Sequence, residues 1–173
     1  MKKIIIIISA FFISYYCHAQ NKELSGFWGV SFYQSADTAM GLIKLNHNYK
    51  TSNISKDGED EILEYRDVFL GDDLCNYAKL YFYENKLCAG YFTILSEDEG
   101  VYKAKISRIV SAIKDKYGAY TMGSEDGAFW DFKEKGFILV SMHSGHLTII
   151  YHDGIIYDQL IKKSQTASSL SDY

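Results

Sequence analysis

The chain has 173 residues, of which 47% are hydrophobic and 23% charged, and its formal net charge at pH 7 is −4. The apolar fraction excludes an intrinsically disordered or low-complexity chain, and the length fits one domain. The acidic balance argues against a nucleic-acid-binding protein, which would carry a basic stripe. The chain contains 15 Tyr and 10 Phe but no Pro, so no proline-rich linker divides it into modules.

The first segment has the form of a secretory signal peptide. Two lysines precede an apolar run over residues 4–13, and the small residue Ala19 follows a more polar stretch. The run is shorter than the roughly 20 residues that a membrane-spanning helix needs. The sequence therefore predicts export with cleavage after Ala19 and no transmembrane segment in the mature chain, an uncleaved membrane anchor being the alternative. Lipoprotein anchoring through Cys17 is not favoured, because Tyr16 stands where a small residue is needed.

The first part of the mature chain predicts a strand, a helix and three further strands. The strand covers residues 26–32, and the helix covers 35–46 because Ser35 suits an N-cap and apolar residues recur on one face. The polar stretch 46–61 predicts an exposed loop, preceded by a short strand near Tyr49. Three strand-like runs then follow, at 62–70, 76–83 and 87–95, separated by turn residues.

The second part repeats this order with a longer helix. Ser96 and Glu99 have the spacing of a capping box, and apolar residues recur at helical spacing until Gly118. Strands are predicted at about 128–133, 136–143 and 146–152, followed by a short helix or strand at 155–163 and a polar tail at 164–173.

The last predicted hairpin carries an internal check of its register. A two-residue turn at 144–145 places position 142 opposite 147, 140 opposite 149 and 138 opposite 151. All six side chains brought to one face are then apolar: Ile138, Val140, Met142, Leu147, Ile149 and Tyr151.

These elements predict a single α+β domain over residues 20–163, with pseudo-halves at about 26–95 and 96–163. The expected architecture is an antiparallel sheet of about six to eight strands with two main helices packed on one face. The repeated order suggests a tandem duplication of a helix followed by three strands. A single sheet without duplication is the alternative.

Two halves of this kind in an exported chain resemble the β-lactamase inhibitory protein group. Each half also resembles the small envelope lipoproteins of outer-membrane assembly. The segments that carry the resemblance are 35–46 with 62–95, and 96–118 with 128–152. The resemblance implies a non-enzymatic domain whose open sheet face binds another protein. No family motif matches, so it assigns no role to a single residue.

The mature chain holds two cysteines, Cys75 and Cys88. Turn residues at 84–86 place Cys88 beside the turn and Cys75 near the far end of the partner strand, beyond bridging distance. A disulfide between them is therefore not favoured, and it stays open only if Cys75 lies in a loop that folds back.

Two histidines, His143 and His146, flank the predicted turn and point the same way, as two metal ligands would. A site needs a further ligand, and His152 on the same face is six residues along its strand, roughly 20 Å away. Exposed loop-tip histidines are the alternative. No metal or other cofactor is predicted, since the chain has no Gly-rich phosphate loop, dinucleotide-binding fingerprint or His-Glu-x-x-His pair.

Tyrosines alternate with core-type residues along the strand at 76–83. Tyr77, Tyr81 and Tyr83 point to one face, whereas the other face carries small or apolar residues. If helices cover the apolar face, the tyrosines lie on an open face, where large amphipathic rings suit binding. A second layer of core is the alternative.

The sequence thus predicts an exported, non-enzymatic binding protein that acts in the periplasm or outside the cell. Its expected partner is a protein of the envelope or the extracellular space, and the candidate binding residues are Tyr77, Tyr81, Tyr83, His143 and His146. One alternative is a small secreted hydrolase or metal-binding protein that uses the face of the two histidines. The other is an envelope assembly or structural factor.

Overall fold

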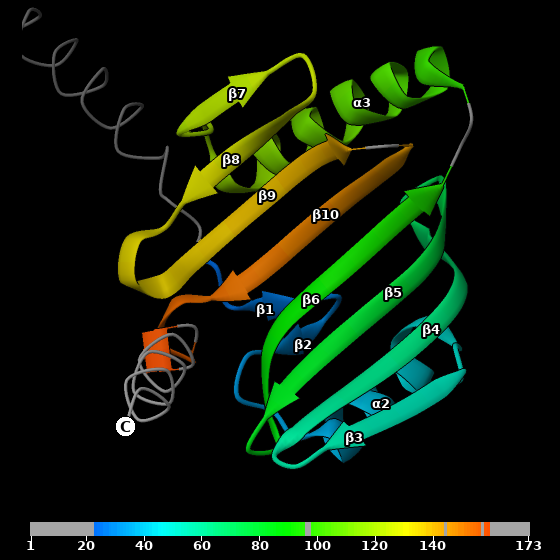
Figure 1. Ribbon diagram of the computed structural model, residues 1–173, viewed down its shortest axis with the longest axis vertical. Coiled ribbons are helices and arrows are strands. Elements are labelled where there is room, and N and C mark those ends of the chain that lie inside the picture. Colours follow the sequence, from blue (N-terminus) through cyan, green and yellow to red (C-terminus); the bar gives the residue numbers. More distant parts are fainter. Residues whose placement is uncertain (1–22, 96–97, 144, 157, 160–173) are drawn as a thin grey trace, which may run out of the picture.

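The computed structural model describes residues 23–95, 98–143, 145–156 and 158–159. The predicted signal peptide, Cys17 and the tail at 164–173 lie outside the described residues. An eight-stranded antiparallel sheet dominates the fold, in the order β3-β4-β5-β6-β10-β9-β8-β7 (Figure 1). The α+β class and the large antiparallel sheet are therefore as predicted.

The first four strands of the sheet are β3 (Asn53–Asp57), β4 (Asp60–Leu70), β5 (Asp73–Tyr83) and β6 (Lys86–Leu95). The other four are β7 (Met122–Ser124), β8 (Gly127–Asp131), β9 (Gly136–His143) and β10 (His146–Asp153). Helix α2 (Ala36–His47) precedes the first four strands, and α3 (Glu99–Tyr117) precedes the second four. A 3₁₀ turn, η1 (Lys133–Lys135), joins β8 to β9. Residues 154–156 and 158–159 are helical.

The strand predicted at 26–32 is wrong. The segment forms a small separate hairpin of β1 (Gly26–Phe27) and β2 (Val30–Ser31). Trp28 and Gly29 turn the chain between them, with φ angles of 51° and 79°. Two successive residues at positive φ make the tight turn that reverses a hairpin.

The prediction of three strands per half missed one strand on each side. No strand forms at Tyr49; the stretch predicted as an exposed loop instead contains β3, which pairs with β4, and β7 pairs with β8 at the opposite edge. Every residue of β3 and β7 is exposed. Short polar edge strands carry no alternation of buried and exposed positions, so periodicity does not find them.

Both predicted helices form, and the second begins differently from the prediction. In α2, the Ser35 hydroxyl accepts a hydrogen bond from Thr38 N, as an N-cap does. In α3 the N-cap is Asp98, whose carboxylate accepts from Gly100 N at 2.8 Å and Val101 N at 3.2 Å. The capping-box prediction put Ser96 there, and Ser96 lies outside the described residues.

Asp98→Ala is expected to lower the free energy of unfolding by about 1 kcal/mol, because two N–H groups lose their acceptor and the helix N-terminus loses a favourable negative charge. Urea unfolding of the mature chain measures this, with Ser96→Ala as the comparison. If Ser96→Ala lowers the free energy of unfolding and Asp98→Ala does not, the N-cap of α3 is Ser96, as the sequence predicted.

The register predicted for the last hairpin is confirmed. Met142 pairs with Leu147, Val140 with Ile149 and Ile138 with Tyr151. The buried or half-buried core face of β10 carries Leu147, Ile149 and Tyr151, so a one-residue slip would turn these side chains away from the core, and the two-residue turn prevents it.

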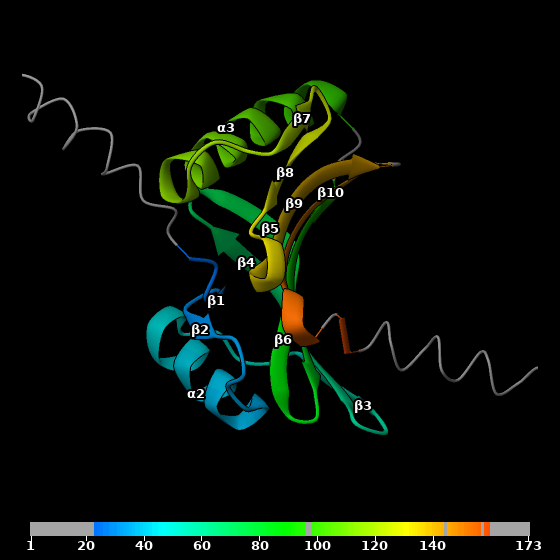
Figure 2. The same ribbon diagram turned by 90° about the vertical axis from the view of Figure 1, so that its left-hand side faces the viewer.

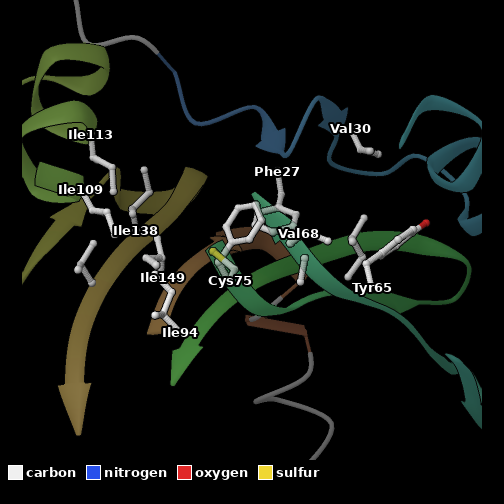
Figure 3. Packing of buried hydrophobic residues seen from close by; sticks show 14 of the residues in the cluster. Phe27, Val30, Tyr65, Val68, Cys75, Ile94, Ile109, Ile113, Ile138 and Ile149 are labelled. Atoms are coloured by element: carbon white, nitrogen blue, oxygen red, sulfur yellow. The ribbon is translucent and has the colours of Figure 1, made fainter. Parts of the chain in front are cut away.

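One hydrophobic cluster joins the β1–β2 hairpin, α2, α3 and one face of the sheet. Figure 3 shows Phe27 in the middle of the packing, with isoleucines of α3, β9 and β10 on one side and Tyr65 and Val68 on the other. Gly90 of β6 lies opposite Leu80 and Tyr151 in the register of the sheet. A Cβ atom there would lie 2.0 to 2.5 Å from three ring carbons of Phe27, so this ring fills the space that a side chain at position 90 would take.

Candidate functional site

The side of the sheet away from this cluster, called the open face below, carries the tyrosines of β5. Ala78, Leu80 and Phe82 are buried in the core, whereas Tyr77, Tyr81 and Tyr83 are half-buried. The alternation along β5 therefore follows the prediction.

A row of aligned residues crosses the open face from one sheet edge to the other. In the order of the strands in the sheet, β3-β4-β5-β6-β10-β9-β8-β7, its members are Asn53, Glu64, Lys79, Tyr91, Ile150, Leu139, Phe129 and Met122. The last five members, Tyr91, Ile150, Leu139, Phe129 and Met122, form what we call the apolar stripe. Its first four members are half-buried and Met122 is 63% exposed. A row of five apolar side chains outside the core is typical of a surface that contacts another molecule.

The polar end of the row is an ion-pair cluster. Glu64, which is buried, accepts from Arg66 Nε at 2.9 Å and lies 3.2 Å from Lys79 Nζ. The Arg66 guanidinium carbon and the Lys79 ammonium lie 5.5 and 5.6 Å from the centroid of the Tyr77 ring, within cation–π range. The charge of Asp67 also acts on Arg66, so two cations and two carboxylates lie at this end of the sheet.

The Glu64 carboxylate predicts a dependence of stability on acid. Burial alone would raise its pKa, but the hydrogen bonds and charges of Arg66 and Lys79 outweigh burial and hold the pKa below its usual range. The stabilisation is complete above the pKa of the unfolded chain, about 4.3, and is lost as the pH falls through the lower folded value. Glu64→Gln is expected to flatten the stability curve below pH about 4.5, by less than about 1 kcal/mol because both cations reach solvent.

Urea unfolding at pH 7 and pH 3.5 checks this, with Glu134→Gln on η1 as the matched control, since Glu134 is exposed. If the parent and Glu64→Gln lose the same free energy of unfolding between pH 7 and pH 3.5, protonation of Glu64 does not contribute to the acid dependence of stability.

Tyr81 and Tyr83 lie at the other end of β5. There the helical residues 154–156 and 158–159, which we call the C-terminal turn, pack on the open face. Ile156 is 3% exposed and packs with Cys88 and Ala89 in a small cluster that the two tyrosines border. The Tyr81 ring also contacts Tyr91, with centroids 4.8 Å apart. Tyr81 thus connects the apolar stripe to the C-terminal turn.

The structure separates the predicted histidines from these tyrosines. His143 and His146 face each other across the β9–β10 turn, and both are exposed. His152, which aligns with Ala89 and through it with Tyr81, is six residues along β10 from His146, about 20 Å. Within the described ranges, no three His, Cys, Asp or Glu side chains lie close enough together to hold a metal ion.

Cys75 and Cys88 are free, buried thiols. Cys75 belongs to the main core and Cys88 to the small cluster under Ile156. Burial, followed by nearby carboxylates, raises the pKa of Cys75 to about 12 and of Cys88 to about 11. Both stay protonated at neutral pH, so neither has the thiolate character of a nucleophile.

Sequence reasoning missed the apolar stripe, although part of its signal was present. The register of the last hairpin already placed Leu139 and Ile150 together on the side away from the core. Phe129 and Met122 could not be added, because aligning them requires the pairing of β7 with β8 and of β8 with β9.

In the described part of the chain, no helix has the length and apolar character needed to cross a membrane. Comparison of the sequence with protein-family models finds no match. Neither curated proteins nor solved structures give a match. The open face is therefore interpreted from its own residues.

Proposed function

We propose that the chain is exported, with cleavage near Ala19, and acts in the periplasm or outside the cell as a non-enzymatic protein that binds another protein through its open face. The observation that carries the proposal is the apolar stripe. Monomeric proteins seldom leave an aligned row of apolar side chains outside their core unless it contacts a partner.

The charges beside the stripe specify the chemistry of the partner. Arg66 and Lys79 flank the stripe on the β4–β5 side, and although both pair with Glu64, their side chains reach solvent and stay accessible to a partner's carboxylates. A partner with an apolar centre and carboxylates at one edge would complement both regions, and edge charges of this kind favour fast and specific association.

The proposal also includes a duplication of the domain. Each half consists of a helix followed by four consecutive antiparallel strands, and the last strands of the two halves, β6 and β10, pair at the centre of the sheet. Figure 2 draws α2 and α3 on the same side of the sheet. This arrangement supports two copies of one unit whose helices leave the opposite face free.

The test uses the mature chain, immobilised and exposed to an envelope extract and culture medium of its own source. Leu139→Lys places a charge in the middle of the apolar stripe, and Tyr81→Ala removes the ring at its C-terminal end. We expect the parent to retain a specific protein, Leu139→Lys to retain at least tenfold less, and Tyr81→Ala to retain less than the parent.

The matched control is Leu45→Lys, because Leu45 of α2 is 80% exposed and lies away from the stripe. It should retain as much partner as the parent, and all variants should melt within a few degrees of the parent. Equal retention by Leu139→Lys and the parent contradicts the proposal. So does a parent that elutes as a dimer which Leu139→Lys dissociates, since the occupant would then be a second copy of the chain.

A further inference from the structure

A groove lies on the core side of the sheet, beneath the C-terminal half of α3. It has two lobes that share four lining residues, Leu70, Lys116, Tyr117 and Tyr151, and we call it the α3 groove. One lobe, of about 350 Å³, extends to the β1–β2 hairpin, and the other, of about 360 Å³, extends to the β4–β5 turn. Each volume is within the range of small-molecule sites.

The lobe under α3 is mostly apolar, whereas the lobe at the hairpin exposes more polar than apolar surface. Phe27 and Phe92 line the lobe at the hairpin, and Ile109 and Ile113 line the lobe under α3. Together with Leu70 they offer apolar side chains in both lobes to an elongated ligand.

Two phenol hydroxyls of the groove have no hydrogen-bond partner within the described ranges. Tyr117 is only 6% exposed, and Tyr117 and Tyr151 line both lobes. Burial, and then the proximity of Tyr117, raises the pKa of Tyr151, so the Tyr151 hydroxyl is a donor at neutral pH. Among the described residues, no group hydrogen-bonds to either hydroxyl, and neither oxygen is fully buried, so both can be reached from the groove. An acceptor on a ligand would satisfy them.

The charges around the groove favour an anion next to these hydroxyls. At the β4–β5 turn, the carboxylates of Asp72 and Asp73 face the cations of Arg108 and Lys105, and Arg108 holds Asp73 in a hydrogen-bonded ion pair. The remaining cation is Lys116, whose ammonium lies 4.9 Å from the centroid of the Tyr117 ring. It has no carboxylate partner in the part of the chain that the structure describes.

We propose that the α3 groove binds a small carboxylic acid with an extended apolar body, whose carboxylate meets Lys116 and the hydroxyls of Tyr117 and Tyr151. The apolar body occupies the lobes beside Leu70. This site lies on the opposite side of the sheet from the apolar stripe, so it does not depend on the protein-binding proposal.

The probe is dodecanoate, titrated into the mature chain by calorimetry, with the fluorescence of Trp28 at the hairpin lobe as a second readout. We expect saturable binding of one dodecanoate per chain. Lys116→Gln should weaken it about fivefold by loss of a partly exposed charge, and Tyr151→Phe about three- to tenfold by loss of a hydrogen bond to an anion. Dodecanol should bind more weakly than dodecanoate and be insensitive to Lys116→Gln.

Two controls separate this site from others. Lys114→Gln removes a lysine charge two residues earlier in α3, at a position that does not line the groove. This variant should bind dodecanoate like the parent. Leu139→Lys disrupts the apolar stripe and should also leave dodecanoate affinity unchanged. Absence of saturable binding overturns the proposal, as does binding that Leu139→Lys abolishes while Lys116→Gln and Tyr151→Phe leave it intact. Both groove variants keep the surrounding packing, and melting curves verify that they are folded.

Discussion

Replacing Gly90 by alanine is expected to destabilise the domain by about 3 kcal/mol, a large effect for a single methyl group. The added Cβ would lie 2.0 Å from the nearest ring carbon of Phe27. That ring cannot move aside freely, because it packs on Phe92 at 4.7 Å and on Tyr151 at 5.5 Å between centroids. The β1–β2 hairpin must therefore shift away from the sheet. Urea unfolding of the mature chain measures the loss.

A double-mutant cycle tests this cause. Phe27→Ala alone should cost about 3 to 5 kcal/mol by leaving a cavity. In the double variant the new methyl group enters that cavity, so its cost should be at least about 1 kcal/mol less than the sum of the two single losses. Gly41→Ala is the control: a Cβ at Gly41 in α2 meets nothing within 4 Å, and alanine there should stabilise the helix by about 0.5 to 1 kcal/mol. Additive losses at 27 and 90 would contradict the explanation.

Gly90 also marks the limit of what the sequence predicts. Within its strand it is one residue in an apolar run, and nothing local indicates that Phe27, from a distant segment, fills its place. The segment of Phe27 was itself predicted as a single strand, because its residues form a strand-like run. The turn at Trp28 and Gly29 interrupts that run. Contacts between distant segments have no periodicity to reveal them.

Local rules did predict the elements that local energetics determine. The β9–β10 register follows from a two-residue turn and six apolar side chains. The buried face of β5 follows from alternation. The exposed edge strands β3 and β7 were missed because pairing alone defines them, and Met122 of the apolar stripe was missed with β7.

The candidate site divides in the same way. The tyrosines of β5 could be placed on one face from the sequence, whereas their separation from His143 and His146 required the complete strand order. The α3 groove was not predictable, because periodicity assigns Tyr117 and Tyr151 to the core, and only the packing of the hairpin beside α3 shows that their hydroxyls line a cavity.

Asp153→Ala is expected to release the C-terminal turn from the open face. Asp153 is 4% exposed, and its carboxylate accepts from the Tyr33 hydroxyl at 2.9 and 3.0 Å and from Ile156 N at 2.9 Å. Burial, and then the hydrogen bond and charge of Asp153, raise the pKa of Tyr33 to about 12, so the phenol donates throughout the neutral range. Without the carboxylate, the turn loses the acceptor that caps it, which costs about 1 to 2 kcal/mol.

The thiol of Cys88 reports this opening, because Ile156 packs against it. In the parent it should react slowly with a disulfide reagent at pH 8, since only an opened state exposes it and only its thiolate attacks. A loss of 1 to 2 kcal/mol in the turn should speed the reaction about five- to thirtyfold. Cys75, buried in the main core, should keep its rate, and Cys75→Ala and Cys88→Ala variants assign the two signals.

Comparison with two further variants shows whether Asp153→Ala speeds the Cys88 reaction through loss of the cap on Ile156 N or through a general loosening of the C-terminal turn. Tyr33→Phe keeps the Asp153 cap on Ile156 N and removes one donor from the carboxylate, so it should speed the Cys88 reaction less than Asp153→Ala does. Asp158→Ala, an exposed change in the same turn, should leave it unchanged. Unaltered protection of Cys88 in Asp153→Ala would mean that Ile156 holds the turn by packing alone. Faster reaction confined to Cys88 would instead show that a single buried carboxylate controls how much of the open face around Tyr81 and Tyr83 the C-terminal turn covers.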